Sequence, residues 1–294
     1  MNLAATTALA ALLAAAPSAQ AAPPADPLAH TYSIVARDPA TGQLGVAVQS
    51  HWFQVGSSVS WAEAGVGAVA TQSFVKVDYG PEGLALMKAG KSAREALEAL
   101  LAADPQKAVR QVAMVDAQGR VAAWTGDHCI AEAGHIEGEG FTVEANLMLS
   151  ATVWPAMAEA YRTSQEDFPG RLLAALEAAQ AAGGDIRGRQ SAALLVVAAK
   201  GTGKPWEGRL VDLRVDDSPE PLVELRRLLE LNRAYTEMNL GDEAVANGAI
   251  PKAVEHYTRA SEMAPEIVEL PFWQAVTLAD SGDEAQALPI FRDV

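Results

Sequence analysis

Short apolar runs with strand character alternate with helical segments along the first three quarters of the chain. The first four runs are rich in β-branched and small residues and are bounded by turn residues, as strands are. They cover residues 31–38, 44–50, 57–63 and 67–72. The Pro-Ala-Thr-Gly segment between the first two runs predicts a hairpin. Four strands are therefore expected before any helix.

Two helical pairs interrupt the strands. Helical periodicity begins at Pro81, stops at Gly90 and resumes at Ser92, where Glu95 completes a capping box. A second pair is expected over residues 152–163 and 169–182. Further strands are expected over residues 109–115, 121–124, 141–149, 191–198 and 209–215. This order differs from the βαβ alternation of a doubly wound sheet. It predicts an α/β (α+β) domain in which two stacked sheets lie between helical layers.

From residue 221 onward the pattern is helical only. Gly248 and Gly282, like Ala253 and Ala287, are 34 residues apart, which is the period of the tetratricopeptide repeat (TPR). We expect a TPR-like helical tail over residues 221–294, with an ordinary helical hairpin as the alternative. Because about three repeats are usually needed for a free-standing array, the tail is expected to dock on the main domain or on another subunit. Such a tail also offers a surface for a protein partner.

The first residues form an Ala/Leu run without charged side chains that ends in Ala19-Gln20-Ala21. A small-x-small pattern is typical of a signal-peptide cleavage site. We therefore expect a signal peptide over residues 1–21, a linker over 22–30 and a periplasmic or secreted protein. A disordered Ala-rich leader is the alternative. The run is too short for a spanning helix, so no membrane anchor is expected.

Charge and motif content narrow the classes of partner. The 22 Lys and Arg residues stand against 37 Asp and Glu residues, a formal net charge of −15, which repels phosphate backbones. No nucleic acid partner is therefore expected. Cys129 is the only cysteine, so no intramolecular disulfide can form. His128, Cys129 and His135 lack the spacing of a zinc site, and no phosphate-binding loop is present. We expect no metal and no cofactor.

Four stretches carry a resemblance to a known family: residues 31–38, 61–72, 188–197 and 211–217. On these stretches, residues 31 to about 231 resemble an uncharacterised bacterial domain family of unknown function that is assigned to the Ntn-hydrolase-like (N-terminal nucleophile) fold. The resemblance implies a four-layer αββα sandwich of Ntn-hydrolase type over residues 31–220 and assembly into a homo-oligomer. It implies no particular reaction, because the family has none established.

The resemblance directs attention to Thr31, which opens the first strand. An N-terminal Thr carries both nucleophile and base, since its Oγ attacks a carbonyl and its α-amine takes the proton. An α-amine with a pKa of about 7.7–8.0 needs no histidine. A cut before Thr31 is required, because signal-peptide removal after Ala21 leaves residues 22–30 in front of it. The alternative is a strand residue selected for β propensity.

Two amides and a hydroxyl are further candidates for the same site. Asn146 lies inside the apolar run 143–149 and is a candidate oxyanion donor; a core amide with a strand partner is the alternative. Ser33 shares a strand face with Thr31 because side chains alternate along a strand. Gln72 ends a buried strand. Ser33 and Gln72 are predicted to bind substrate.

Arg189 and Gln190 precede another buried strand. A guanidinium there is suited to clamp a substrate carboxylate or to pair with an aspartate such as Asp212. Both residues are predicted to contact substrate, with a structural ion pair as the alternative for Arg189. Ser50-His51 lacks the Gly-x-Ser-x-Gly elbow of a serine hydrolase, and lone cysteines such as Cys129 are usually inert core residues.

Two functions from different classes follow. The first is an exported amidohydrolase that acts on a small amide or peptide with Thr31 as nucleophile, which requires a mature N-terminus at Thr31. The second is a non-catalytic periplasmic binding or scaffold protein that keeps its leader through His30 and recruits a partner through the helical tail. Relatives with peptidoglycan-binding modules make a cell-wall peptide a conceivable ligand, by analogy alone.

Overall fold

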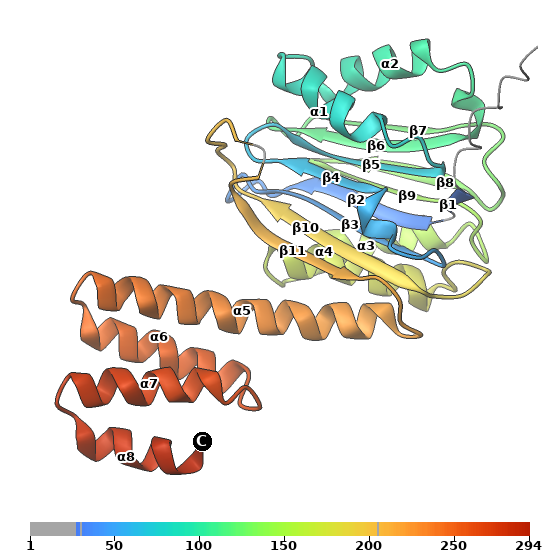
Figure 1. Ribbon diagram of the computed structural model, residues 1–294. Coiled ribbons are helices and arrows are strands. Elements are labelled where there is room, and N and C mark those ends of the chain that lie inside the picture. Colours follow the sequence, from blue (N-terminus) through green and yellow to red (C-terminus); the bar gives the residue numbers. More distant parts are fainter. Residues whose placement is uncertain (1–27, 30, 205) are drawn as a thin grey trace, which may run out of the picture.

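The computed structural model describes residues 28–29, 31–204 and 206–294. The signal peptide expected over residues 1–21 lies outside the described residues, as does most of the expected linker. Figure 1 shows two sheets with helices on their outer sides and a separate stack of helices at the C-terminal end.

Two antiparallel sheets form the body of the described chain. The first has the strand order β11-β10-β3-β2-β9-β8, and the second has the order β1-β5-β6-β7 with β4 beside β5. The first sheet comprises β2 (Thr31–Arg37), β3 (Leu44–Ser50), β8 (Gly134–Gly138), β9 (Phe141–Ala145), β10 (Ser191–Val197) and β11 (Arg209–Val215). The second comprises β1 (Leu28–Ala29), β4 (Ser60–Glu63), β5 (Gly67–Phe74), β6 (Arg110–Asp116) and β7 (Val121–Thr125).

Each sheet carries a pair of helices on its outer face. The helices are α1 (Tyr79–Lys88) and α2 (Ala93–Ala103) on the second sheet, and α3 (Val153–Thr163) and α4 (Phe168–Ala181) on the first. Apolar side chains of β3, β10, β5 and β6 form a core between the sheets, and separate cores lie beneath each helix pair. The mixed α/β architecture predicted from the order of elements is therefore confirmed.

The β2–β3 hairpin forms where it was predicted. The main-chain N–H and the hydroxyl of Thr41 donate to Asp38 Oδ2 at 2.9 and 2.6 Å. Gly42 has a φ of +75°, which glycine adopts without steric cost. This turn sets the register in which Thr31 lies opposite Ser50.

Two strands were not predicted, and the runs predicted over residues 57–63 and 141–149 form shorter strands, β4 and β9. The strand β8 contains two glycines, and its composition is poor in β-prone residues; it forms because the edge of β9 offers a pairing partner. The strand β1 likewise exists through pairing with β5. The run predicted over residues 141–149 leaves the sheet after Ala145, and Leu147 has a φ of 57°.

The predicted capping box is present at the start of α2. Ser92 Oγ accepts from the main-chain N–H of Glu95, and the Glu95 carboxylate accepts from the N–H of Ser92. Replacing Ser92 with Ala is expected to lower the free energy of unfolding by about 0.5–2 kcal/mol, because a helix N–H loses its acceptor. Urea unfolding measures the loss. Ser92→Thr, which retains a hydroxyl acceptor, is the control and should recover most of it.

The remaining helices form the tail expected from the sequence: α5 (Pro221–Ala246), α6 (Ile250–Met263), α7 (Glu269–Asp280) and α8 (Glu284–Asp293). Leu222, Leu225 and Leu229 at the start of α5 belong to the core beneath α3 and α4. Farther along, Ala234 packs with α6 and the start of α7. The helix α5 therefore joins the body to the tail.

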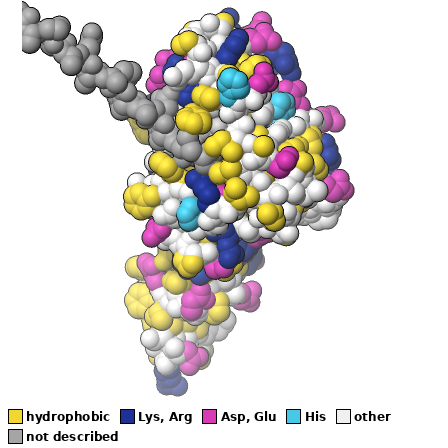
Figure 2. Space-filling model, turned by 90° about the vertical axis from the view of Figure 1, so that its right-hand side faces the viewer, with side chains coloured by type: hydrophobic (Ala, Val, Ile, Leu, Met, Phe, Trp, Pro, Cys, Tyr) yellow, Lys and Arg dark blue, Asp and Glu magenta, His cyan; other side chains and the backbone are white. Residues whose placement is uncertain are grey.

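The surface of the described chain is mixed in character. Figure 2 shows acidic side chains scattered among apolar and basic ones over one face. Among the described helices, none combines the length and the apolar character that a membrane crossing requires.

Candidate functional site

Thr31 begins β2 with its side chain between the two sheets. It lies opposite Ser50 of β3, which in turn lies opposite Ser191 of β10, so three hydroxyl side chains form a row across the sheet. Val35, on the same face of β2, belongs to the core between the sheets. Thr31 is fully buried, and its Oγ1 donates to Ser50 Oγ at 3.1 Å.

Amide side chains from the opposing sheet and from the end of β9 converge on the main chain of Thr31. Gln72 Nε2 donates to the Thr31 carbonyl oxygen at 3.2 Å. The main-chain N–H of Asn146 donates to the same oxygen at 3.1 Å, and Asn146 Nδ2 lies 3.5 Å from it. The structure therefore brings together Thr31, Gln72 and Asn146, which the sequence had singled out separately.

Gln111 connects these amides and was missed by the sequence analysis. Its Oε1 accepts from Gln72 Nε2 and from Asn146 Nδ2, each at 2.8 Å. Its Nε2 donates to Thr125 Oγ1 and to the carbonyl oxygen of Ala145, each at 2.9 Å. A polar amide on the inward-facing side of an otherwise apolar strand was the available signal.

Ser33 lies on the same face as Thr31, as predicted, and contacts a buried acid. Ser33 Oγ donates to Glu144 Oε1 at 3.2 Å. Glu144 is fully buried, and its Oε2 has no hydrogen-bond partner among the described residues. Burial raises the pKa of Glu144 well above its ordinary value, against the lowering effect of the Ser33 hydrogen bond. Glu144, a charged residue inside an apolar strand, was also missed.

His135 faces Glu144 across the β8–β9 pair. Its Nδ1 lies 2.8 Å from Thr125 Oγ1, which joins it to the amide network of Gln111. Burial lowers the pKa of His135, so the neutral imidazole is favoured. Burial thus favours the neutral form of both titratable groups, Glu144 and His135, in this polar cluster.

The geometry defines what Thr31 can do in the uncut chain. Its nitrogen belongs to a peptide bond and accepts no proton, while its hydroxyl donates to another hydroxyl, Ser50, which is a weak base. A free α-amine at Thr31 would supply a base directly beside the hydroxyl. The Asn146 amide nitrogen has two hydrogens; it donates to Gln111 and lies 3.5 Å from the Thr31 carbonyl oxygen. The predicted oxyanion role therefore requires one of these hydrogens to turn toward the substrate.

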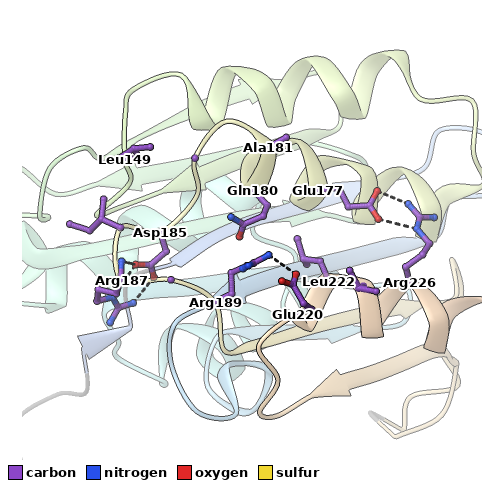
Figure 3. A pocket seen from close by; sticks show the side chains of 14 residues that line it. Leu149, Glu177, Gln180, Ala181, Asp185, Arg187, Arg189, Glu220, Leu222 and Arg226 are labelled. Carbon is purple, nitrogen blue, oxygen red and sulfur yellow. Dashed lines mark hydrogen bonds and ion pairs between the residues drawn. The ribbon is translucent and has the colours of Figure 1, made fainter.

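Arg189 and Gln190 do not join the Thr31 cluster. Arg189 forms an exposed ion pair with Glu220, and Gln190 Nε2 donates to Asp217 Oδ1 at 3.0 Å. Asp212, considered as a partner for Arg189, instead pairs with two arginines of its own strand. Arg189 lines a separate pocket of about 840 Å³, shown in Figure 3.

The surroundings of Cys129 are those of a structural cysteine rather than a reactive one. Its Sγ donates to the carbonyl oxygen of Arg110 at 3.3 Å. Burial raises the pKa of the thiol, which disfavours the reactive thiolate.

Comparisons with known proteins identify the family. A model described as "Family of unknown function (DUF1028)" matches residues 31–225. Among solved structures, the chain is similar to a DUF1028 protein from Silicibacter pomeroyi, with a TM-score of 0.62 and 32% sequence identity, over 68% of this chain and 88% of that chain. A search of curated proteins found no match. The match spans both sheets from β2 onward and the start of α5, so the chain belongs to DUF1028, a family of unknown function.

Proposed function

We propose that this chain is an exported amide hydrolase of the Ntn type, acting on a small amide or peptide, with Thr31 as nucleophile once the residues before it are removed. The observation that carries the proposal is the position of Thr31, which begins β2 with its hydroxyl inside a polar cluster between two sheets. The family match begins at the same residue, and sheets enclosed by helices agree with a four-layer sandwich of the Ntn type.

The proposed reaction passes through an ester on Thr31. The Oγ1 attacks the carbonyl carbon of the substrate, and the freed α-amine takes the hydroxyl proton. The resulting ammonium gives its proton to the leaving amine as the tetrahedral intermediate collapses. Water, deprotonated by the same α-amine, then attacks the ester carbonyl. As the second tetrahedral intermediate collapses, Oγ1 leaves and takes the proton back from the ammonium, which releases the acid and restores Thr31. An α-amine pKa of about 7.7–8.0 permits these transfers near neutral pH.

The neighbouring residues would hold the nucleophile in place. Gln72 and Asn146 fix the carbonyl of Thr31, and Ser50 sets the direction of its hydroxyl. Fixing a nucleophile in this way reduces the entropy lost on reaching the transition state. Asn146 is the proposed oxyanion donor, and Ser33 with Gln72 is proposed to contact the substrate.

The uncut chain is closed at this site. Leu28 and Ala29 of β1 pair with Phe74 and Ser73 at the end of β5, and Thr31 is fully buried. Removing these residues would uncover the end of β5 beside Thr31 at the same time as it creates the amine. One cut would therefore supply both access and base.

The same burial favours a second function, a non-catalytic periplasmic binding or scaffold protein. If the residues before Thr31 stay in place, β1 remains part of the sheet and the hydroxyl stays closed off. The four helices of the tail would then be the functional surface, since helix-pair arrays commonly present a concave face to peptides.

The first test is the mass and N-terminal sequence of the mature protein from its native compartment. A start at Thr31 is expected. The mature protein should then form one covalent adduct per chain with a β-lactone, an electrophile that acylates nucleophilic hydroxyl groups. Thr31→Ala should form none, while Thr31→Ser, which retains a hydroxyl, should still react.

A mature chain that starts near Ala22 and forms no adduct would exclude the hydrolase and leave the scaffold function. Adduct formation that persists in Thr31→Ala would place the nucleophile elsewhere.

A further inference from the structure

A second concave site lies behind the sheet that carries Thr31. It is bounded by α4, by residues 183–189 and by the start of α5, as Figure 3 shows. Tyr32 belongs to the core on this side of the sheet, whereas Thr31 faces the other sheet. The volume of about 840 Å³ falls within the range of about 300–1,000 Å³ usual for small-molecule sites.

Part of the pocket lining is apolar and exposed. Leu149, Ile186 and Val223 come from three different segments and have 65%, 54% and 67% of their surface exposed. Scattered exposed apolar side chains are ordinary on protein surfaces, but a group of them in one concavity indicates a binding site. An apolar part of a ligand would remove these side chains from water.

The charged part of the lining is balanced. Three arginines face three acids, which are Arg187, Arg189, Arg226, Glu177, Asp185 and Glu220. The whole chain, in contrast, has a formal net charge of −15. A ligand with one net charge would leave a charge of the lining unmatched. A ligand that carries one positive and one negative group would match it.

One of these ion pairs is suited to exchange with a ligand. The Arg189 and Glu220 side chains are 38% and 51% exposed, and exposed pairs contribute little to stability. The Asp185 carboxylate, in contrast, is buried against Arg187, and Arg226 bridges Glu177 and Glu166. Arg189 and Glu220 are therefore the charges a ligand can recruit at low cost.

Polar atoms without partners lie behind the floor of the pocket. The Tyr32 hydroxyl lies within hydrogen-bond distance of the side-chain oxygens of Gln49 and Gln180, and Gln180 lines the pocket. Gln49 is fully buried, yet its Nε2 has no hydrogen-bond partner among the described residues. His51 is only partly buried, but its buried Nδ1 atom also has no hydrogen-bond partner among the described residues, and it lies beside Gly188 of the lining. Buried polar groups nearly always have partners, so unused hydrogen-bonding capacity remains behind the lining, to which neither Gln49 nor His51 belongs.

We propose that this pocket binds a zwitterion with an apolar side chain, the class of free apolar amino acids and short peptides with free termini. The ligand carboxylate forms a bidentate pair with the Arg189 guanidinium, and the ligand ammonium pairs with Glu220. The apolar side chain covers Ile186 and Val223. The exchange leaves every charge paired and the net charge of the site at zero.

Isothermal titration calorimetry of the full-length wild-type chain with the dipeptide L-alanyl-L-leucine tests the proposal. Mass spectrometry of the recovered dipeptide establishes that the heat comes from binding alone. Saturable binding is expected. Arg189→Gln and Val223→Asp should each weaken it at least tenfold. Arg227→Gln is the matched control, because Arg227 forms an exposed ion pair with Glu224 on the same helix but does not line the pocket.

Two capped dipeptides separate the ligand classes. N-acetylation removes the ammonium, C-terminal amidation removes the carboxylate, and each is expected to weaken binding. Equal binding of the acetylated form would show an anion site and overturn the zwitterion proposal. The absence of saturable heat, or binding unchanged by both pocket substitutions, would also overturn it. None of these outcomes depends on Thr31, because the lining shares no residue with the Thr31 cluster.

Discussion

Replacing Gln111 with Leu is expected to lower the free energy of unfolding by at least about 3 kcal/mol. The amides of Gln72 and Asn146 both lose the acceptor Oε1, and the carbonyl of Ala145 loses a donor. Each buried group that loses a partner costs about 1–3 kcal/mol. Leu has a similar volume to Gln but forms none of these hydrogen bonds. The loss in the free energy of unfolding therefore exceeds that of a typical surface or helix-cap substitution.

Urea unfolding measures this loss, with Gln118→Leu as the matched control. Gln118 is exposed and lies just beyond the end of the same strand, so its substitution should change stability by less than about 0.5 kcal/mol. If Gln111→Leu behaves like the control, the amide network is not a stabilising feature of the fold. Under the proposed function, the same variant should also react more slowly with a β-lactone, because the Thr31 main chain loses its support.

Replacing Glu144 with Gln is expected to stabilise the protein at about pH 8 and to leave it nearly unchanged near pH 4. In the unfolded chain a glutamate ionises near its usual pKa of about 4.3. In the folded chain burial raises the pKa of Glu144, so the folded state keeps the proton while the unfolded state loses it. Stability therefore falls as the pH rises between the two pKa values, by up to about 1.4 kcal/mol per pH unit. Gln cannot ionise, so the variant lacks this slope.

Denaturant unfolding of both proteins across this pH range measures the difference. Cys129 and His135, the neighbouring titratable groups, are unchanged in the variant, so their contributions largely cancel. Glu98→Gln on the exposed side of α2 is the surface control. A constant difference between wild type and Glu144→Gln at all pH values would show that Glu144 is hydrated rather than buried.

Part of the cluster around Thr31 was predicted from polar residues in or beside apolar strands. Asn146 and Gln72 were identified inside or at the end of apolar runs, whereas Thr31 was identified by the family resemblance at the start of its strand. The structure brings their atoms together through contacts between distant segments. Gln111 and Glu144 carry the same signal and could have been found by applying it to every strand. The hydrogen-bond partners of these residues could not have been predicted, because the network depends on how the two sheets stack.

The ion-pair partner of Arg189 could not be predicted from the sequence, for a different reason. The sequence shows an arginine before a buried strand, but several acids lie within reach of such a flexible side chain. Glu220 is selected because the chain turns back after β11 and begins α5 beside the pocket. The strands β1 and β8 were missed for a similar reason, since both form only where another strand presents an edge.

The helix α5 has a mechanical consequence. Its 26 residues span about 39 Å at 1.5 Å per residue. One end is held to the body by Leu225, which packs in the core beneath α3 and α4, and by the ion pairs of Arg226 with Glu177 of α4 and Glu166 just before it, while the other end packs against α6. The helix α5 is thus a rigid connection, and a partner bound by the helices α6 to α8 keeps a fixed distance and orientation relative to Thr31. A proline in the middle of α5 would introduce a flexible hinge between the body and the tail and leave both ends of the helix folded.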